Sequence, residues 1–192
     1  MAPKILAFAG SMREESYNKK LVKIGVGGAR KAGAEVTLID LNDYRFPLYD
    51  GDLEAKEGLP KLAKDMKKLM IEHDGFLIAS PEYNSSVSGV LKNVIDWVSR
   101  PEKEDQGNLP AFRGKVAALM SASPSGLGGL RGLVALRSLL ENIYCMVLPE
   151  QVTVSHAEKA FTPSGRLQDV DLEERVLRQG KNLVDILTKI KG

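Results

Sequence analysis

Residues 76–97 read FLIASPEYNSSVSGVLKNVIDW, and this stretch decides the fold. Its first four residues, Phe76–Ala79, form a short apolar run typical of a buried strand. The polar loop Ser80–Asn84 follows, and apolar residues then recur at helical spacing from Gly89 onward. A polar loop between a buried strand and a helix is where an open α/β sheet usually binds its ligand. The stretch therefore predicts both a parallel α/β sheet and a ligand site at its edge.

The same alternation of strand and helix continues along the chain. Near-continuous apolar strands separated by helices indicate a parallel sheet covered on both faces. Right-handed crossovers then predict a doubly wound, three-layer α/β/α sandwich with five parallel strands in the order 2-1-3-4-5. The expected strands are Lys4–Ala9, Glu35–Leu41, Gly75–Ala79, Lys115–Met120 and Tyr144–Leu148, the last resumed at Val152–Val154. The expected helices begin near Ser16, Pro60, Gly89 and Leu130, and a final one carries Val176, Leu183, Leu187 and Ile190 on one face.

Three segments depart from a simple pattern. Gly25, Gly27 and Gly28 weaken the first helix by propensity, so we expect something packed closely against them. The connection 42–59 is long and predicted irregular, and connections of that length are often functional. The basic run Lys61–Lys68 has helical spacing and is predicted to form a solvated face.

The bulk composition narrows the class of protein. The chain has 192 residues, 43% apolar and 27% charged, which fits one compact domain over 1–192. A net charge of +2, without a dense Lys/Arg block, argues against a nucleic-acid partner. Cys145 is alone, and only His73 and His156 could assist it, so neither an internal disulfide nor a clustered zinc site is expected. In its apolar run Cys145 is interpreted as a small buried hydrophobe rather than a nucleophile. No signal peptide or membrane span is recognised, and a cytoplasmic location is expected.

Three polar loops should meet at one carboxyl edge, because they follow the first, third and fourth strands of the predicted sheet. Loop one offers hydroxyl, amide and guanidinium groups at the start of a helix, where free N–H groups suit a phosphate. These groups belong to Ser11, Arg13, Ser16 and Asn18. The alternative is that Ser16 or Asn18 only caps the helix. Neither a Walker A motif nor GxGxxG is present.

Loop three and loop four would hold the flat end of a ligand. Loop three supplies Pro81, Glu82, Tyr83 and Asn84, which offer an aromatic face and polar groups for the edge of a heterocycle. Glu82 is either a general acid or base or a structural carboxylate, and the second is the commoner role. Loop four runs over Ser121–Gly129, and its small residues permit close approach of the backbone, although it could be only a flexible connector. Nearby Trp97 is interpreted as core or subunit packing rather than a stacking platform.

These motifs resemble those of the NAD(P)H-dependent FMN reductase family of flavodoxin-like proteins, which includes bacterial quinone and chromate reductases. The likeness extends from the first strand to about residue 155. The matching segments are Gly10-Ser11-x-Arg13-x-x-Ser16-x-Asn18, then Pro81-Glu82-Tyr83-Asn84-x-Ser86-x-x-Gly89-x-Leu91-Lys92-Asn93-x-Ile95-Asp96-Trp97, and the Ser121–Gly129 loop with Arg131. The chain departs from the family at Ser123-Pro124-Ser125, where similar proteins often have more glycine.

The resemblance implies one flavodoxin-like domain with noncovalently bound FMN. Its phosphate would lie on Ser11, Arg13, Ser16 and Asn18. Its ring would lie along Pro81, Glu82, Tyr83 and Asn84, with Ser121, Ser123 and Gly126 of loop four completing the pocket. NADPH or NADH would give hydride to flavin N5, and a quinone, free flavin or similar small acceptor would take the electrons, with no catalytic side chain required. Members of the family are usually homodimers or homotetramers.

Two other functions stay open from the sequence. One is a flavodoxin-type electron carrier without NAD(P)H oxidase activity, although such carriers tend to be strongly acidic and this chain is nearly neutral. The other is a nucleotide-binding or regulatory module without redox activity. The choice between NADH and NADPH is also open, and Arg45 and Arg100 are the candidates to meet a 2′-phosphate.

Overall fold

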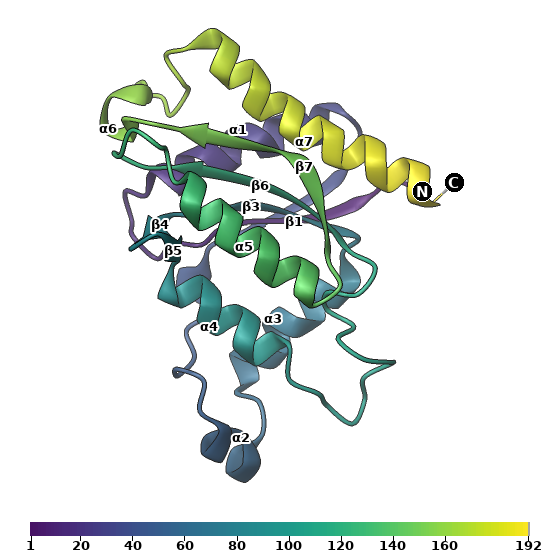
Figure 1. Cartoon of the computed structure of the whole chain (residues 1–192). Helices are drawn as coiled ribbons and strands as arrows, with labels where there is room; N and C mark the ends of the chain where they lie inside the picture. Colours follow the sequence, from purple (N-terminus) through teal and green to yellow (C-terminus); the bar gives the residue numbers. More distant parts are fainter. Residues whose placement is uncertain (192) are drawn as a thin grey trace.

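The computed structural model describes residues 1–191 as three layers built on a five-stranded parallel sheet (Figure 1). The strands are β1 (Lys4–Ala9), β2 (Glu35–Ile39), β3 (Gly75–Ala79), β6 (Val116–Ala122) and β7 (Met146–Val154). Their order is β2-β1-β3-β6-β7, which is 2-1-3-4-5 when the strands of this sheet are counted along the chain. The predicted sandwich and strand order are therefore confirmed.

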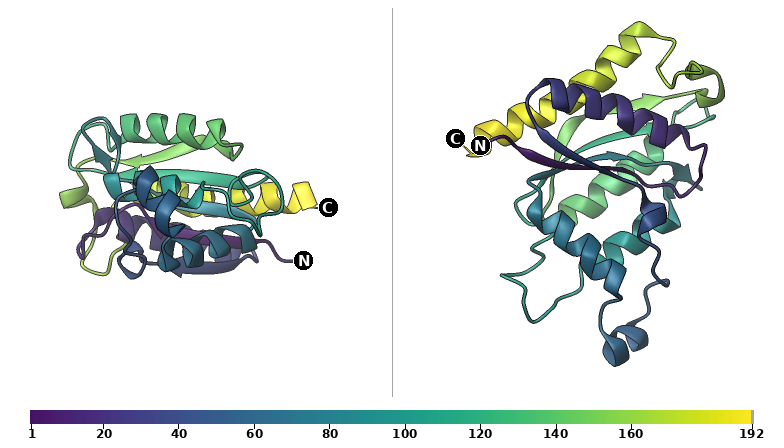
Figure 2. Two further views of the ribbon diagram at one scale, coloured as in Figure 1. Left: turned by 90° about the horizontal axis from the view of Figure 1, so that it is seen from below. Right: turned by 180° about the vertical axis from the view of Figure 1, so that it is seen from behind.

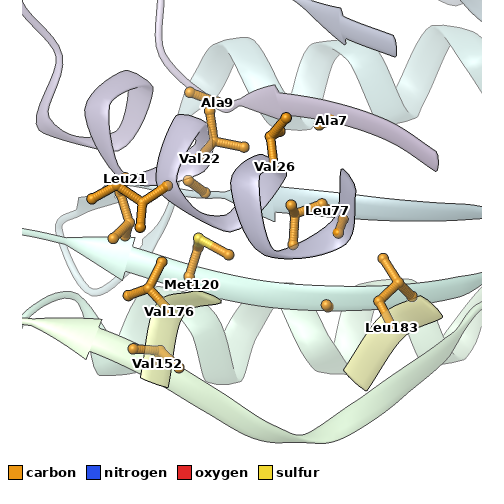
Figure 3. Close-up of a cluster of buried hydrophobic side chains, with 14 of the residues drawn as sticks. Ala7, Ala9, Leu21, Val22, Val26, Leu77, Met120, Val152, Val176 and Leu183 are labelled. Carbon is orange, nitrogen blue, oxygen red and sulfur yellow. The ribbon is translucent and has the colours of Figure 1, made fainter. Parts of the chain in front are cut away.

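Five main helices cover the two faces of the sheet (Figure 2). Alternate residues of a strand point to opposite faces, so Ile5 and Ala7 belong to one core and Leu6 and Phe8 to the other. The first core, drawn in Figure 3, is closed by α1 and α7, and the second by α3, α4 and α5. These helices are α1 (Tyr17–Lys31), α3 (Lys61–Glu72), α4 (Gly89–Val98), α5 (Leu130–Asn142) and α7 (Val170–Lys191).

The glycines of α1 are explained by the helix that lies against it. A side chain at Gly28 would overlap the carbonyl oxygen of Leu177, and one at Gly180 would overlap that of Gly25. Helices α1 and α7 therefore approach one another backbone to backbone, as the right-hand view of Figure 2 shows. The expectation of close packing is confirmed for Gly25 and Gly28. Gly27 is exposed, and a Cβ there would lie 3.7 Å from its nearest neighbour, Leu177 Cδ2.

Two stretches predicted as loops contain regular structure. The connection 42–59 holds the end of a short 3-10 helix, η1 (Leu41–Asp43), and the helix α2 (Gly51–Glu57), which lies away from the sheet (Figure 1). Strand β2 ends at Ile39, two residues before the predicted end, because the Asp40 carboxylate accepts a hydrogen bond from the backbone N–H of Asn42 and starts η1. After β3 the chain forms a small hairpin, β4 (Glu82–Tyr83) with β5 (Ser86–Val87).

Strand β7 is continuous where a gap was expected. Its pairing with β6 shifts between Ala117 and Leu119, so the region of Pro149, which has no N–H to give, is accommodated as an irregularity. The buried amide of Gln179 donates to the carbonyl oxygens of Leu119 and Glu150 there, at 3.4 and 2.7 Å. Strand β6 runs to Ala122, two residues beyond its predicted end, and a short helix α6 (Ala157–Ala160) follows β7.

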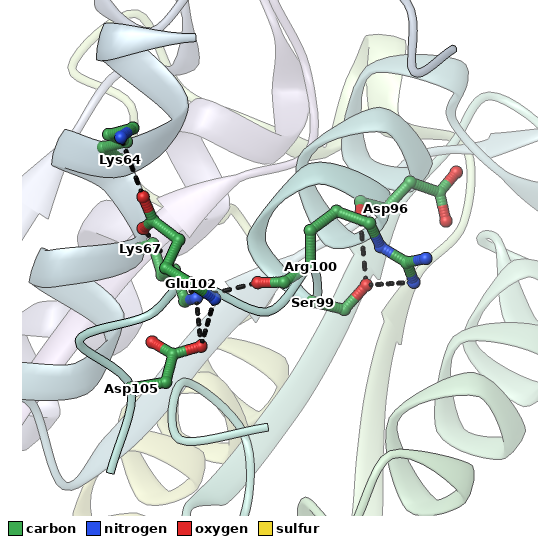
Figure 4. A network of polar contacts seen from close by, with 7 residues as sticks. All are labelled: Lys64, Lys67, Asp96, Ser99, Arg100, Glu102 and Asp105. Carbon is green, nitrogen blue, oxygen red and sulfur yellow. Dashed lines mark hydrogen bonds and ion pairs between the residues drawn. The ribbon is translucent and has the colours of Figure 1, made fainter. Parts of the chain in front are cut away.

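The prediction that Lys61–Lys68 forms a solvated face is wrong for Lys67. Its side chain is 2% exposed, and its Nζ lies 2.6 Å from Asp105 Oδ2 and 2.7 Å from the carbonyl oxygen of Arg100 (Figure 4). Glu102 and Asp105, from the loop after α4, face this lysine, which helical spacing alone does not reveal. Trp97 is fully buried and its Nε1 donates to the Pro47 carbonyl, so its assignment to the core is confirmed.

Within residues 1–191, none of the helices combines the length and apolar character that crossing a membrane requires.

Candidate functional site

Loops one, three and four are joined at the carboxyl edge of the sheet. The backbone N–H of Gly10 donates to the carbonyl oxygen of Ala79 at 2.9 Å. The Ser88 hydroxyl, at the end of loop three, donates to the Gly10 carbonyl oxygen at 2.6 Å and also accepts from the Leu91 N–H, which caps α4. Ser88 was not among the expected site residues, although a serine just before a helical pattern is the usual signal for such a cap. The convergence expected from topology is thus made by direct contacts.

Loop one presents hydrogen-bond donors that no other residue of the described range 1–191 uses. Ser16 is the N-cap residue of α1 and is buried, yet its side chain makes no capping hydrogen bond. The Arg13 side chain is exposed and has no hydrogen-bond or ion-pair partner within residues 1–191. Ser11 is buried, and its hydroxyl accepts weakly from the Arg13 N–H at 3.3 Å. No acidic residue lies in the first turn of α1. This donor set at a helix N-terminus has the chemistry of an anion site.

Asn18 also makes no cap, but both polar atoms of its amide are bonded to one residue. Its Nδ2 donates to the carbonyl oxygen of Ala122, and its Oδ1 accepts from the N–H of the same residue, both at 2.9 Å. The side chain is 3% exposed. Asn18 therefore straps the first turn of α1 to the end of β6, where loop four begins.

Loop three is a tight hairpin whose turn residues are left-handed. Asn84 has φ of 51° and Ser85 has φ of 63°, the pattern of the turns that join two short antiparallel strands. Pro81 is buried behind the hairpin, while Tyr83 is 49% exposed and presents its ring to solvent. The sequence did not indicate this hairpin, because Asn84-Ser85 lacks the glycine that usually marks such a turn.

The Glu82 carboxylate is committed to the helix that follows loop four. Its Oε1 lies 2.9 Å from Arg131 Nη2 and 3.1 Å from Arg131 Nε, and its Oε2 accepts from the Gly132 N–H at 3.0 Å. Its side chain is 6% exposed. Of the two roles left open for Glu82, this geometry supports the structural one.

Loop four begins at a buried residue and continues as an exposed backbone. Ser121 lies inside β6 and is fully buried, and its hydroxyl has no hydrogen-bond partner in the described part of the chain. Ser123 Oγ accepts from the Ser125 N–H at 3.2 Å, which shapes the start of the loop. Gly126 is exposed with open space where a side chain would be, so its backbone is accessible. At Gly129 a side chain would overlap the Ser121 hydroxyl, so only glycine fits there.

The other chemistry-bearing side chains lie elsewhere. Cys145 is 1% exposed, and burial raises the pKa of its thiol to about 12, which confirms the interpretation as a buried hydrophobe. Arg45 Nη2 donates to Asn42 Oδ1 at 2.6 Å, and Arg100 lies over the Tyr49 ring, 5.2 Å from its centroid. Among residues 1–191, no group of three or more His, Cys, Asp or Glu side chains is placed to hold a metal ion.

Comparison with known proteins gives consistent matches over almost the whole chain. The model of the family described as NADPH-dependent FMN reductase matches residues 3–159. The NAD(P)H-dependent FMN reductase of Pseudomonas aeruginosa is 34% identical over 191 residues, which cover 98% of this chain and 97% of that protein. The NAD(P)H:quinone oxidoreductase of Solanum tuberosum is 31% identical over 194 residues, covering 98% and 95%.

A solved structure resembles the fold closely. It is FerB of Paracoccus denitrificans, described as a flavoenzyme NAD(P)H:(acceptor) oxidoreductase. The TM-score is 0.80 with 27% identity, and the match covers 98% of each chain. The resemblance noted from the sequence motifs is thereby confirmed, together with the oxidoreductase class and with FMN and NAD(P)H as cofactors. The chain belongs to the family of NADPH-dependent FMN reductases.

Proposed function

We propose that this chain holds FMN at the carboxyl edge of its sheet and oxidises NAD(P)H there, with a quinone, free flavin or similar small molecule as the acceptor. The observation that carries the proposal is the junction of three loops at one edge, with a set of unused donors at the start of α1. Gly129, where a side chain would overlap the Ser121 hydroxyl, shows that the backbone packs closely at the same edge.

At the phosphate end, Arg13 would supply charge and the hydroxyls of Ser11 and Ser16 would supply hydrogen bonds. The free N–H groups of the first turn of α1 would add to them. Asn18 contributes through its strap to Ala122, which keeps loop one at a fixed distance from loop four. Because no carboxylate among residues 1–191 pairs with the Arg13 guanidinium, its charge can meet the phosphate.

At the ring end, Pro81–Asn84 would line one side and loop four the other. The half-exposed Tyr83 ring offers an aromatic face, and the accessible backbone at Gly126 offers hydrogen-bond groups to the edge of a flat heterocycle. Ser123 would also contact the edge of the heterocycle on the loop-four side. Ser121 is one layer deeper, beneath Gly129, and would act by supporting the loop rather than by touching the ring.

FMN, when bound, supplies the redox chemistry, since its N5 position accepts hydride from NAD(P)H and the electrons then pass to the acceptor. The residues of this chain bind and orient it, and they keep a donor and then an acceptor in stacking contact. The similarity to a protein of Solanum tuberosum named NAD(P)H:quinone oxidoreductase supports a quinone as the acceptor. We further propose that the protein works as a homodimer or homotetramer in the cytoplasm, as the family resemblance implies.

The test is a titration of the purified protein with FMN, followed by NADPH or NADH under argon. We expect quenching of flavin fluorescence on binding, bleaching of the visible flavin absorbance by NAD(P)H, and return of the absorbance when a benzoquinone is added. A protein that takes up no FMN would refute the proposal. One that takes up FMN but is reduced only by a one-electron donor would point instead to an electron carrier.

A further inference from the structure

The carboxylate of Glu82 occupies the beginning of α5 in place of a side-chain cap from the helix itself. The N-cap residue of α5 is Gly129, which has no side chain and a left-handed φ of 91°. The first N–H groups of a helix need acceptors, and the partial positive charge there favours an anion. Glu82 Oε2 accepts from Gly132, the third residue of the helix, and Oε1 receives Arg131 Nε and Nη2. One carboxylate from loop three thus caps α5 from outside and is neutralised by α5 itself.

The glycine at 132 allows this contact at its present distance. A Cβ at that position would lie 3.0 Å from Glu82 Cβ, 3.1 Å from Glu82 Cα and 3.2 Å from the carbonyl oxygen of Ser86. These distances are shorter than most real contacts of a Cβ atom, so a larger residue would shift the hairpin by a few tenths of an ångström. The backbone of α5 and the hairpin β4–β5 are therefore packed directly against each other.

The hairpin depends on this attachment for its position. Each of its strands has only two residues, and a pair of strands that short is not stable alone in water. Its turn also holds Asn84 at φ of 51°, which asparagine tolerates, and Ser85 at φ of 63°, a conformation that is uncommon for serine. One end of the hairpin is fixed by Ser88 on Gly10, and the other by Glu82 on Arg131 and Gly132. Tyr83 and Asn84 lie between the two attachments.

We propose that Glu82 and Arg131 form a positioning pair for the flavin ring. They hold the turn of loop three against the helix that follows loop four, and so they fix the distance between the two sides of the ring site. The proposal rests on the proposed function, because it assigns a role in the same site. It gives the Glu82 carboxylate no part in proton transfer, since its oxygens are already bonded to α5.

The experiment compares Glu82→Ala, Glu82→Gln, Arg131→Gln and Arg131→Lys with the native protein. Arg178→Gln is the control, because Arg178 is an exposed arginine on α7 without a bonded partner among residues 1–191. The readouts are the FMN dissociation constant, the visible circular dichroism of bound FMN, and kcat and KM for NAD(P)H. The circular dichroism reports the geometry around the ring, which a general loss of stability would leave unchanged once the flavin is bound.

We expect Glu82→Ala to weaken FMN binding about tenfold, because the cap and the ion pair are both lost. Glu82→Gln keeps an acceptor for Gly132, and Arg131 is 57% exposed, so Glu82→Gln and Arg131→Gln should each weaken binding by only about threefold. All three should alter the circular dichroism of bound FMN and lower kcat, and Arg131→Lys should restore part of both. The effects of Glu82→Gln and Arg131→Gln should not add in the double variant.

If the variants bind FMN with native circular dichroism and native kcat, the pair has no positioning role, whatever happens to their melting temperatures. That result leaves the proposed function intact. If the native protein itself fails to bind FMN, the proposed function fails first. Should Glu82→Ala not fold, the two glutamine variants and Arg131→Lys still decide the question.

Discussion

Asn18 and Ala122 exchange two hydrogen bonds of 2.9 Å although 104 residues separate them in the chain. The pair connects the helix that follows the first strand with the end of the fourth strand of the sheet. Both polar atoms of the Asn18 side chain are buried. Breaking this contact is therefore costly, because the backbone N–H and carbonyl of Ala122 would be left buried without these partners.

Replacing Asn18 with Ala should therefore reduce both stability and FMN affinity. The buried N–H and carbonyl of Ala122 would lose their partners, which should lower the free energy of unfolding by about 1–3 kcal/mol. Urea unfolding measures this loss, and a fluorescence titration measures FMN affinity. Asn142→Ala is the control, since Asn142 is exposed at the end of α5. Equal stability of the two variants would show that the strap contributes nothing.

Replacing Arg13 with Ala should weaken FMN binding without destabilising the fold. The Arg13 side chain is exposed and unpartnered in the described chain, so folding does not depend on it. A charge-assisted bond to the phosphate contributes roughly 1.5–3 kcal/mol, or about 10- to 150-fold in the dissociation constant. Riboflavin, which lacks the phosphate, should bind the variant and the native protein alike. A loss of affinity that is equal for FMN and riboflavin would place Arg13 away from the phosphate.

Adjacent glycines in α1 should respond in opposite directions to the same substitution. Gly28→Ala puts a methyl group onto the Leu177 carbonyl and should cost about 1–3 kcal/mol of stability. Gly27→Ala meets only an ordinary van der Waals contact, with Leu177 Cδ2 at 3.7 Å, and should gain up to about 1 kcal/mol. Thermal and urea unfolding of the two variants test this directly. A stable Gly28→Ala protein would mean that α1 and α7 do not pack backbone to backbone.

The glycines of α1 show what the sequence could reveal and where it could not. Three glycines inside an otherwise helical pattern signal a tertiary constraint, and near-continuous apolar strands separated by helices signal a parallel sheet. The sequence does not reveal which group a buried polar side chain bonds to. The sequence leaves Asn18 open between a phosphate ligand and a cap, and Glu82 open between an acid or base and a structural carboxylate, whereas the fold places Ala122 and Gly132 beside them. Local pattern predicted which loops meet at the carboxyl edge of the sheet, but not which of their side chains are already bonded.

Cys145 should be inert in the native protein. Burial raises the pKa of its thiol to about 12, so it stays protonated at neutral pH and out of reach of reagents. A thiol reagent at pH 8 should react with one group per chain in urea and with none in buffer.

The raised pKa of Cys145 also makes stability depend on pH. The pKa of the thiol is roughly 8.5 in the unfolded chain and higher in the folded one, so the unfolded chain loses this proton first and stability falls as pH rises. The difference in unfolding free energy between native protein and Cys145→Ala should therefore shrink between pH 8 and pH 10. Rapid labelling without urea would contradict the buried position.

Lys67 and Lys68 are neighbours in α3, and their replacement by Met should have very different results. Lys67 is buried on Asp105 and the Arg100 carbonyl, whereas Lys68 is 76% exposed with Glu72 3.8 Å away. Removing one partner of a buried pair leaves a buried charge, so Lys67→Met should cost about 3 kcal/mol. Lys68→Met should change stability by less than about 0.5 kcal/mol.

The loss in Lys67→Met should be concentrated in the segment that this lysine holds. Glu102 and Asp105 both face its ammonium group, at 3.9 and 2.6 Å, so hydrogen exchange of residues 101–108 should accelerate while that of β3 should change far less (Figure 4). Adding Asp105→Asn to Lys67→Met removes the stranded carboxylate and should recover part of the lost stability. If the two methionine variants unfold at the same urea concentration, the lysine is not buried in solution, and the interpretation of the basic run as a solvated face would stand after all.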